Sequence, residues 1–274
     1  MAILAPTRAT GSHFYKYSSP DHLERLENIA LKHSLYFPTL GELNDPADAK
    51  PRLAPLPPEK LAAHVYDNLI KSNPGLSLAD RRHKAVEITC DAHLRPYRLL
   101  RELARKLYAH MNRTHRVYCL SKHYDNLVMW AKYAGNHSGY CLEFANEGPF
   151  FTCAFDVAYV DELPFMDITD PEDRGPYIFF KHSRWSGEEE VRVGGLNLDG
   201  NPMVSFDSHC LRRIILGPRM SAENEKTIRE WADRREPKLD VVKAYFDDFD
   251  LKMKLPLSSP YRRIKIITPH SPTP

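Results

Sequence analysis

The stretch Trp185-Ser-Gly-Glu188-Glu189-Glu190-Val191-Arg192 has most influence on how the chain is interpreted. Read as the start of a strand, it places Glu188, Glu190 and Arg192 on one face, because strand side chains alternate between the two faces of a sheet. Charged groups lose hydration when they are buried, so a face that only has to pack rarely carries two carboxylates and a guanidinium. Two interpretations follow. The strand is either a solvated, salt-bridged edge, or a polar site where a carboxylate is a base or stabilises charge and Arg192 binds an anion.

The composition is that of an ordinary globular protein. Of the 274 residues, 42% are hydrophobic and 27% are charged, and 38 basic residues against 36 acidic ones leave a net charge of +2. That balance gives no reason to expect a nucleic-acid-binding protein, in which basic residues gather on one face. No apolar run approaches the roughly 20 residues of a membrane span, and residues 1–13 lack the apolar segment of a signal peptide. We therefore expect a cytoplasmic protein that does not enter a membrane.

Several familiar site motifs are absent from the sequence. The chain contains no Gly-x-x-x-x-Gly-Lys, Gly-x-Gly-x-x-Gly or Gly-x-Ser-x-Gly, which disfavours P-loop NTPases, Rossmann dehydrogenases and α/β-hydrolases. The five cysteines are widely spaced and form no Cys-x-x-Cys pair, so we expect buried free thiols and no metal site. They are Cys90, Cys119, Cys141, Cys153 and Cys210.

Short aromatic and β-branched runs, separated by Gly, Pro, Asn and Asp, predict an α+β fold with about seven to nine strands. Their short connections favour mostly antiparallel pairing. We expect residues 150–160 to pair with residues 139–144 through the turn at 146–149, and Asp199-Gly200 to form a hairpin between the Glu-rich strand and residues 203–206. The prediction is one domain over residues 1–274, with a strand at 261–267 and a disordered tail at 268–274.

Residues of about 55–113 differ from the rest of the chain, because they show helical periodicity and alternating charges without a strong strand. Ser77 is placed to cap a helix, and Pro96 should split it, since proline cannot continue a helix from within. We interpret this region as an inserted helical subdomain. Its basic residues between positions 95 and 106 form either a solvated helix face or a surface for a phosphate or a partner.

The loop between residues 41 and 51 supplies two candidate site residues, Asn44 and Asp45. Asn, Asp and Pro are turn formers, so these residues are explained by turn chemistry alone. Loops that leave strands also carry binding and catalytic groups more often than their share of the chain, which keeps both as candidates.

A second candidate segment runs from the strand at residues 116–120 through Ser121 into a helix at 126–134. Tyr133 lies beside the expected buried face of this helix and is either part of the core or open to a pocket. That buried face is predicted to contain Leu127, Trp130, Ala131 and Ala134.

Four motifs occur in the order in which they are found in the bacterial family of unknown function DUF2971, and the chain resembles that family. They are Phe14-Tyr-Lys-Tyr17, Leu43-Asn-Asp-Pro46, the segment 119–134 leading into 137–144, and the segment 180–192. Arg213-Ile-Ile-Leu-Gly217 is similar to the closing strand of the family. The resemblance covers most of residues 14–235, apart from the helical insertion.

The layout of this family looks like that of ADP-ribosyltransferase-type domains, which implies a split, twisted, mostly antiparallel sheet flanked by helices, and NAD as the substrate. By this resemblance, Glu190 or Glu188 stabilises the oxocarbenium-like transition state, and Tyr133 stacks on nicotinamide. A one-residue bulge would exchange the two glutamates, so both stay open. The other residues expected around the nucleotide are Tyr15, Lys16, Tyr17, Asn44, Asp45, Ser121, Trp130, Lys181 and Arg192.

Three functions are therefore expected, in decreasing order of support. The first is an NAD-dependent ADP-ribosyltransferase or NAD-cleaving effector of bacterial conflict or phage defence, with a protein or nucleic acid as acceptor. The second is a non-catalytic sensor or interaction module whose helical insertion binds a partner. The third is a nuclease with Mg²⁺ held by carboxylates drawn from Asp45, Glu143, Glu188 and Glu190.

Overall fold

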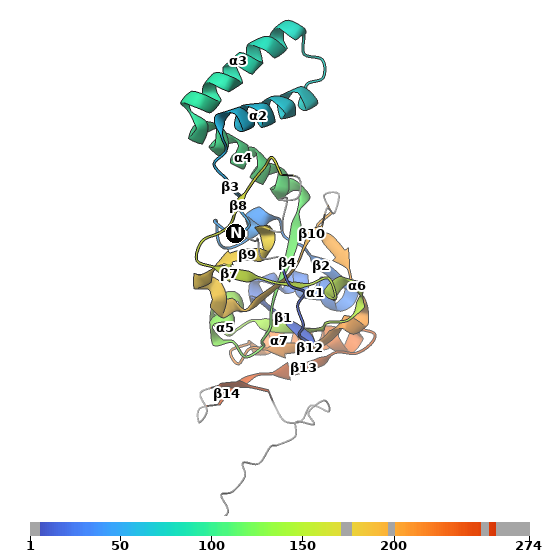
Figure 1. Ribbon diagram of the computed structural model, residues 1–274. Helices are drawn as coiled ribbons and strands as arrows, with labels where there is room; N and C mark the ends of the chain where they lie inside the picture. The colour runs from blue at the N-terminus through green and yellow to red at the C-terminus, as the bar shows by residue number, and fades with distance from the viewer. Residues whose placement is uncertain (1–5, 171–176, 197–200, 248–251, 256–274) are drawn as a thin grey trace, which may run out of the picture. The chain divides into compact units, whose positions relative to one another are not determined.

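The computed structural model describes residues 6–170, 177–196, 201–247 and 252–255 (Figure 1). The expected turn at Asp199-Gly200, the expected strand at 261–267 and the expected tail lie outside these residues. The fold is α+β, with a mixed seven-stranded sheet in the order β13-β12-β5-β1-β4-β10-β6. The chain forms two compact units that are interleaved in sequence, so the expectation of one domain stays a prediction.

Unit 1 consists of Met1–Thr10, Leu35–Leu120 and Glu147–Val204, and unit 2 of Gly11–Ser34, Ser121–Asn146 and Ser205–Pro274. The strands mostly in unit 1 are β2 (Ser34–Tyr36), β3 (Arg52–Leu53), β4 (Arg116–Ser121), β6 (Phe155–Asp156), β7 (Ala158–Val160), β8 (Phe165–Met166), β9 (Phe180–His182), β10 (Glu190–Leu196) and β11 (Met203–Ser205). Those of unit 2 are β1 (His13–Ser18), β5 (Tyr140–Ala145), β12 (Leu211–Leu216), β13 (Asp240–Lys243), β14 (Tyr245–Asp247) and β15 (Lys252–Lys254).

In unit 2, β1 pairs antiparallel with β5 and β5 pairs antiparallel with β12, while β13 adds to β12 in parallel. Three helices belong to this unit: α1 (Leu23–Lys32), α5 (Leu127–Tyr133) and α7 (Ala222–Arg234). Helix α5 packs on one face of the strands, because Trp130 and Met129 share a buried cluster with Tyr17, Cys141 and Ile215. Helices α1 and α7 contact each other.

In unit 1, β10 pairs antiparallel with β6, and short parallel pairs form between β3 and β8 and between β7 and β9. The region predicted to be helical forms α2 (Pro58–Ser72), α3 (Leu78–Leu94) and α4 (Pro96–Thr114), while its status as an inserted subdomain stays a prediction; α6 (Gly148–Phe151) lies outside this region. Helices α2 and α3 lie side by side (Figure 1). Ser77 caps α3 by accepting from the Asp80 amide, and Pro96 starts α4, as expected from their positions in the sequence.

The insertion has its own apolar core, which holds α2 and α4 together. Leu61 and Ala62 of α2 pack with Ala92 of α3 and with Leu99 and Leu100 of α4. The basic residues of α4 are solvated: Arg98 is 52% exposed and pairs with Asp91 and Glu102. The fold therefore supports the expectation of a solvated helix face there.

Four sequence expectations about local structure are wrong. The Glu-rich strand begins at Glu190 and not at Glu188, because Glu188 ends a 3₁₀ helix, η4 (Ser183–Glu188). Residues 150–160 do not pair with β5; β6 pairs with β10 and β7 with β9. Residues 177–182, whose sequence predicts a short helix, form one 3₁₀ turn, η3 (Tyr177–Phe179), and strand β9. Among the described residues, β11 pairs with β2 and not with β10.

The buried face of α5 is also rotated from the expected one. Trp130 and Ala134 are buried as predicted, but Leu127 is 38% exposed and Ala131 is exposed, while Met129 is buried. The helix has only seven residues, too few for its periodicity to fix the face.

The five cysteines form no disulfide in the part of the chain that the structure describes, and the expectation of buried thiols is met by Cys141 and Cys210 alone. None of the described helices is long and apolar enough to cross a membrane. The cytoplasmic location stays a prediction.

Candidate functional site

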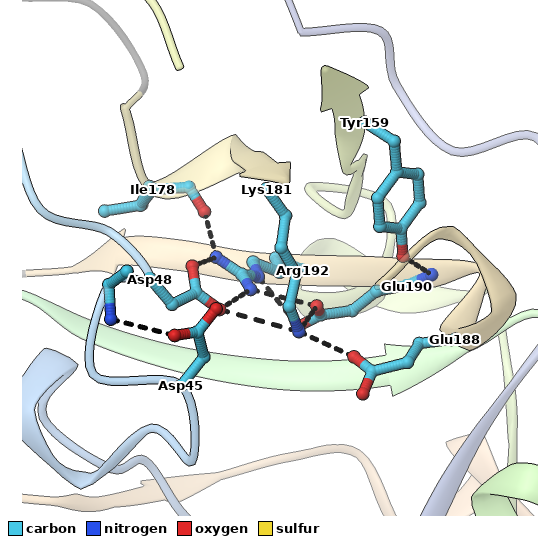
Figure 2. A network of polar contacts seen from close by, with 9 residues as sticks. Asp45, Asp48, Tyr159, Ile178, Lys181, Glu188, Glu190 and Arg192 are labelled. Carbon is cyan, nitrogen blue, oxygen red and sulfur yellow. Dashed lines mark hydrogen bonds and ion pairs between the residues drawn. The ribbon is translucent and has the colours of Figure 1, made fainter. Parts of the chain in front are cut away.

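The Glu-rich stretch of unit 1 turns sharply before it becomes a strand. The turn η4 ends at Glu188, Glu189 adopts a left-handed conformation with φ of 44°, and β10 starts at Glu190. Left-handed backbone is costly for a residue with a Cβ atom, so this single residue marks a constrained point in the chain. The turn leaves both Glu188 and Glu190 directed at Lys181 (Figure 2). The two carboxylates are thus neighbours, as expected, but through a turn and not through strand alternation.

Arg192 is the centre of a buried ion network and uses all its hydrogen-bond donors within it. The two η nitrogens bind Asp48 at 2.9 and 2.6 Å, and the ε and second η nitrogens bind Glu190 at 2.7 and 2.9 Å. The fifth hydrogen goes to the carbonyl oxygen of Ile178 at 2.5 Å. A guanidinium has five N–H donors, so Arg192 is saturated by two bidentate pairs and one backbone contact.

Lys181, on β9, is the second cation of the network. Its ammonium donates to Glu188 at 2.6 Å and to Glu190 at 2.9 Å, and it lies 3.5 Å from a carboxylate oxygen of Asp48. It also lies 5.1 Å from the centroid of the Trp185 ring, within the range of a cation–π contact. The ammonium thus occupies the point where the three carboxylates converge (Figure 2).

The network is almost completely removed from solvent. The exposed fraction of each side chain is 0% for Arg192, 1% for Asp48, 3% for Lys181, 5% for Glu190 and 6% for Glu188. Three carboxylates and two cations leave a formal charge of −1. Burial of charge is costly unless every group is paired, which explains the dense hydrogen bonding.

Protonation states follow from these contacts. Burial alone would raise the pKa of Glu190, but the charges and hydrogen bonds of Arg192 and Lys181 outweigh it and lower that pKa from 4.5 to about 2. Burial would likewise lower the pKa of Lys181, but Glu190 and Glu188 raise it above its ordinary value. Both groups are therefore charged at neutral pH, so Glu190 is a fixed negative charge and a poor general base.

Tyr159 anchors the start of β10. Its hydroxyl oxygen accepts from the backbone N–H of Glu190 at 2.8 Å, and burial raises the pKa of this tyrosine. The adjacent Val157 amide donates to the Glu190 carbonyl at 3.0 Å. Segment 157–159 thus fixes the backbone from which the Glu190 side chain projects (Figure 2).

The structure brings together four of the residues proposed from sequence: Lys181, Glu188, Glu190 and Arg192. The two candidates of the loop 41–51 have lesser roles. Asn44 is exposed, and Asp45 organises its own turn by accepting from the Ala47 amide at 2.9 Å. That turn delivers Asp48, which with Glu190 is one of the two bidentate partners of Arg192.

Sequence reasoning missed Asp48 and Tyr159 as members of this environment. A signal for Asp48 existed, because an Arg on a buried strand requires a carboxylate partner. Asp48 is, however, 144 residues away from Arg192, and several acidic residues could have filled that role.

The remaining candidates belong to unit 2. Tyr17 packs edge-on against Trp130 with ring centroids 5.3 Å apart, and the Trp130 indole donates to the Tyr124 carbonyl at 2.7 Å. Trp130 is fully buried, so within this unit it is a core residue. Tyr133 is half-buried against the same cluster. Ser121 is buried, with its hydroxyl oxygen 3.4 Å from the His123 amide.

The three residues of the N-terminal strand do not share one face. Tyr15 and Tyr17 pair with Glu143 and Cys141 and lie on the face covered by α5. Lys16 pairs with Leu142 and lies on the opposite face, because strand residues alternate.

Among the described residues, no group of three or more His, Cys, Asp and Glu side chains is arranged to hold a metal ion. At the ion network, the Lys181 ammonium lies between the carboxylates that a cation would need. Asp45 faces its own turn, and Glu143 belongs to unit 2, so the carboxylates suggested for a nuclease do not form one described group.

Comparison with known proteins finds no matching family model, no matching curated protein and no matching solved structure. The resemblance to DUF2971 therefore stays a prediction.

Proposed function

We propose that the protein is a nucleotide-using enzyme that cleaves NAD, with Glu188 as the catalytic carboxylate and Glu190 as its positioning residue. The observation that carries this proposal is the bridge that Lys181 makes between the two carboxylates, at 2.6 Å from Glu188 and 2.9 Å from Glu190. A negative charge held in place before reaction stabilises positive charge that develops at the ribose as the bond to nicotinamide breaks.

The two glutamates differ in a way that assigns their roles. Glu190 accepts from Arg192 on both oxygens and from Lys181, so its lone pairs are taken by protein donors. Glu188 is also buried, and it ends the same 3₁₀ turn that carries Trp185. We place the substrate on the side of Glu188, while Glu190 and Asp48 hold the Lys181 ammonium against it.

The proposal also includes an ADP-ribosyltransferase-type fold. In the proposed reaction the ADP-ribosyl group is transferred to a protein, a nucleic acid or water as nicotinamide leaves. The resemblance to such domains implies an N-terminal strand, a strand followed by an aromatic helix and a late Glu on a strand. The chain has β1, β4 before helix α5, and Glu190 at the start of β10, which supports this part of the proposal.

Three neighbouring glutamates provide a matched series for the test. Purified protein is incubated with NAD, and nicotinamide release is measured for Glu188→Gln, Glu189→Gln and Glu190→Gln. We expect Glu188→Gln to lower the rate about a hundredfold or more, the size found when a preorganised electrostatic contact is removed. Glu189 is exposed, so Glu189→Gln should retain the wild-type rate. Glu190→Gln should lower both rate and thermal stability, because it weakens two buried pairs.

Absence of nicotinamide release, together with absence of NAD binding by calorimetry, contradicts the proposal. An equal loss of rate in Glu188→Gln and Glu189→Gln contradicts the assigned roles.

A second function, a non-catalytic interaction module, is favoured by one specific observation. Every N–H of Arg192 is used inside the protein, so this residue does not offer the anion clamp expected from the sequence. In that case the network only holds the fold, and the helical insertion binds a partner. Large apolar side chains on α3 and α4 are available for this: Leu78, Val86, Leu94 and Tyr97 are 65–77% exposed.

A further inference from the structure

We propose that unit 1 contains a second site, which binds a small molecule with an anionic head group and an extended apolar body. The site is a cavity between α2, α4 and the segments 166–168 and 177–179. The cavity has a volume of about 1070 Å³. Small-molecule sites usually measure about 300–1,000 Å³, so this one holds a ligand of cofactor size. Neither Glu188 nor Glu190 lines it, so the site is separate from the proposed NAD chemistry.

The interior of the cavity is apolar. Its surface is formed largely by Leu107 and Met111 of α4, by Met166 and Ile168, and by Tyr177 and Phe179. Contact between this apolar surface and water is unfavourable in free energy. The apolar part of a bound ligand would remove the surface from water and so contribute to affinity.

The charges around the cavity select the sign of the ligand. Lys106 of α4 is exposed, lines the cavity and forms no ion pair with any carboxylate in the described part of the chain. Asp167 is the acidic residue of the lining, and its carboxylate is engaged by its own turn, accepting from the amide and hydroxyl of Thr169 at 2.8 and 2.6 Å. Asp167 keeps its negative charge, but one of its oxygens is already bonded to Thr169, whereas the Lys106 ammonium is the cationic donor that the lining offers to a ligand. The ligand we propose is therefore an anion, with its charged end at Lys106.

Imidazole groups complete the polar part of the lining. His110 lies one turn after Lys106 in α4, His115 follows the end of α4, and His64 comes from α2. His64 shares a hydrogen bond of 2.8 Å with Asn68, which also lines the cavity. An imidazole ring donates a hydrogen bond in either protonation state, so these side chains suit the oxygens of a carboxylate or a phosphate.

The walls are fixed in advance by packing. Met111 belongs to a buried cluster with Val117 and Ile178, and α2 is held to α4 by the core of the insertion. Ile178 is one of the residues that line the cavity, and its backbone carbonyl accepts a hydrogen bond from Arg192 at 2.5 Å. The buried ion network thus supports one wall, and a preformed wall lowers the entropic cost of binding.

The experiment compares four probes with the same alkyl chain on the full-length protein, by calorimetry below their aggregation thresholds. They are decanoate, decyl phosphate, decanol and decyltrimethylammonium. We expect decanoate or decyl phosphate to bind at least tenfold more tightly than decanol, and the cationic probe to bind most weakly. The two anions distinguish a carboxylate ligand from a phosphate ligand.

Variants locate the binding. Lys106→Met should weaken anion binding about tenfold to a hundredfold, the loss of one charged hydrogen bond. Arg105→Met, which removes the neighbouring charge outside the lining, should leave affinity unchanged. Ile168→Trp fills the cavity and should weaken all the probes, while thermal denaturation verifies that the variant folds.

Equal affinity for decanol and decanoate, or equal effects of Lys106→Met and Arg105→Met, would overturn the proposal. Displacement of decyl phosphate by NAD would do so as well, because it would place the dinucleotide in this cavity. Failure of NAD cleavage would leave the present proposal standing, since it depends on probe binding alone.

Discussion

Replacement of Arg192 by lysine separates the geometry of the buried network from its charge. The substitution keeps the formal charge of the five side chains at −1, but an ammonium has three hydrogens where the guanidinium has five. Arg192 makes five hydrogen bonds to Asp48, Glu190 and the Ile178 carbonyl, so Arg192→Lys loses at least two of them. Hydrogen bonds to charged groups contribute about 1.5–3 kcal/mol each, which sets a loss of about 3–6 kcal/mol before relaxation.

Relaxation of the surrounding side chains lowers this figure, and we expect a loss of about 3 kcal/mol in the free energy of unfolding. The measurement is denaturation by urea, followed by circular dichroism and tryptophan fluorescence. Trp185 lies 5.1 Å from the Lys181 ammonium and reports on the network itself. For a protein of this size the loss corresponds to a fall of about 6–12 °C in melting temperature.

Arg229→Lys is the matched control, because Arg229 also makes several hydrogen bonds but is 44% exposed. Exposed ion pairs contribute less than about 1 kcal/mol, so this variant should be nearly as stable as the wild type. A cost below about 1 kcal/mol for Arg192→Lys would refute the reasoning. It would mean that charge balance alone, and not the paired geometry around the guanidinium, holds the network together.

Three further predictions concern the same region and the core of unit 2. The pKa of Glu190 is lowered from 4.5 to about 2, which contributes about 3 kcal/mol to the free energy of unfolding above pH 4.5. This contribution is lost as the pH falls from 4.5 toward 2. Urea unfolding measured at a series of acid pH values should detect the loss of stability, and Glu190→Gln should abolish this pH dependence. Glu189 has a φ of 44°, so Glu189→Gly should raise the free energy of unfolding by about 0.5–1 kcal/mol, whereas Glu230→Gly within α7 should lower it by about 1 kcal/mol; equal effects would contradict the inferred strain. Trp130→Phe removes a fully buried indole and its hydrogen bond to Tyr124, and should lower the free energy of unfolding by about 2–4 kcal/mol, as measured by thermal denaturation. A loss below about 1 kcal/mol would contradict the core assignment.

The parts of the fold that sequence reasoning predicted are those with local signals. Ser77 and Pro96 mark helix starts by their own chemistry, so the starts of α3 and α4 could be predicted from the sequence. The joint position of Glu190 and Arg192 followed from strand alternation, because both lie in β10.

The parts that failed depend on contacts between distant segments. The chain of residues 155–160 was assigned to the wrong partner because β6 and β10 pair across more than 30 residues, and the sequence holds no register signal for such a pair. Asp48 was missed for the same reason. The left-handed Glu189 was also missed, since glycine or asparagine is the usual indication of that conformation.

The burial of the network itself bears on function. A buried ion cluster is commonly less stable than an apolar set of similar volume, so stability alone does not account for five ionised side chains that are at most 6% exposed. What such a cluster provides is position: Asp48 and Glu190 hold Arg192 on two sides, and Lys181 is held in turn against Glu188. Glu188 ends the turn just before the strained residue Glu189 and accepts from the Lys181 ammonium at 2.6 Å. A structural role would be served by any member of the network, whereas the proposed catalytic role requires the charge of Glu188 in particular, which is why the comparison of Glu188→Gln with Glu190→Gln separates the two.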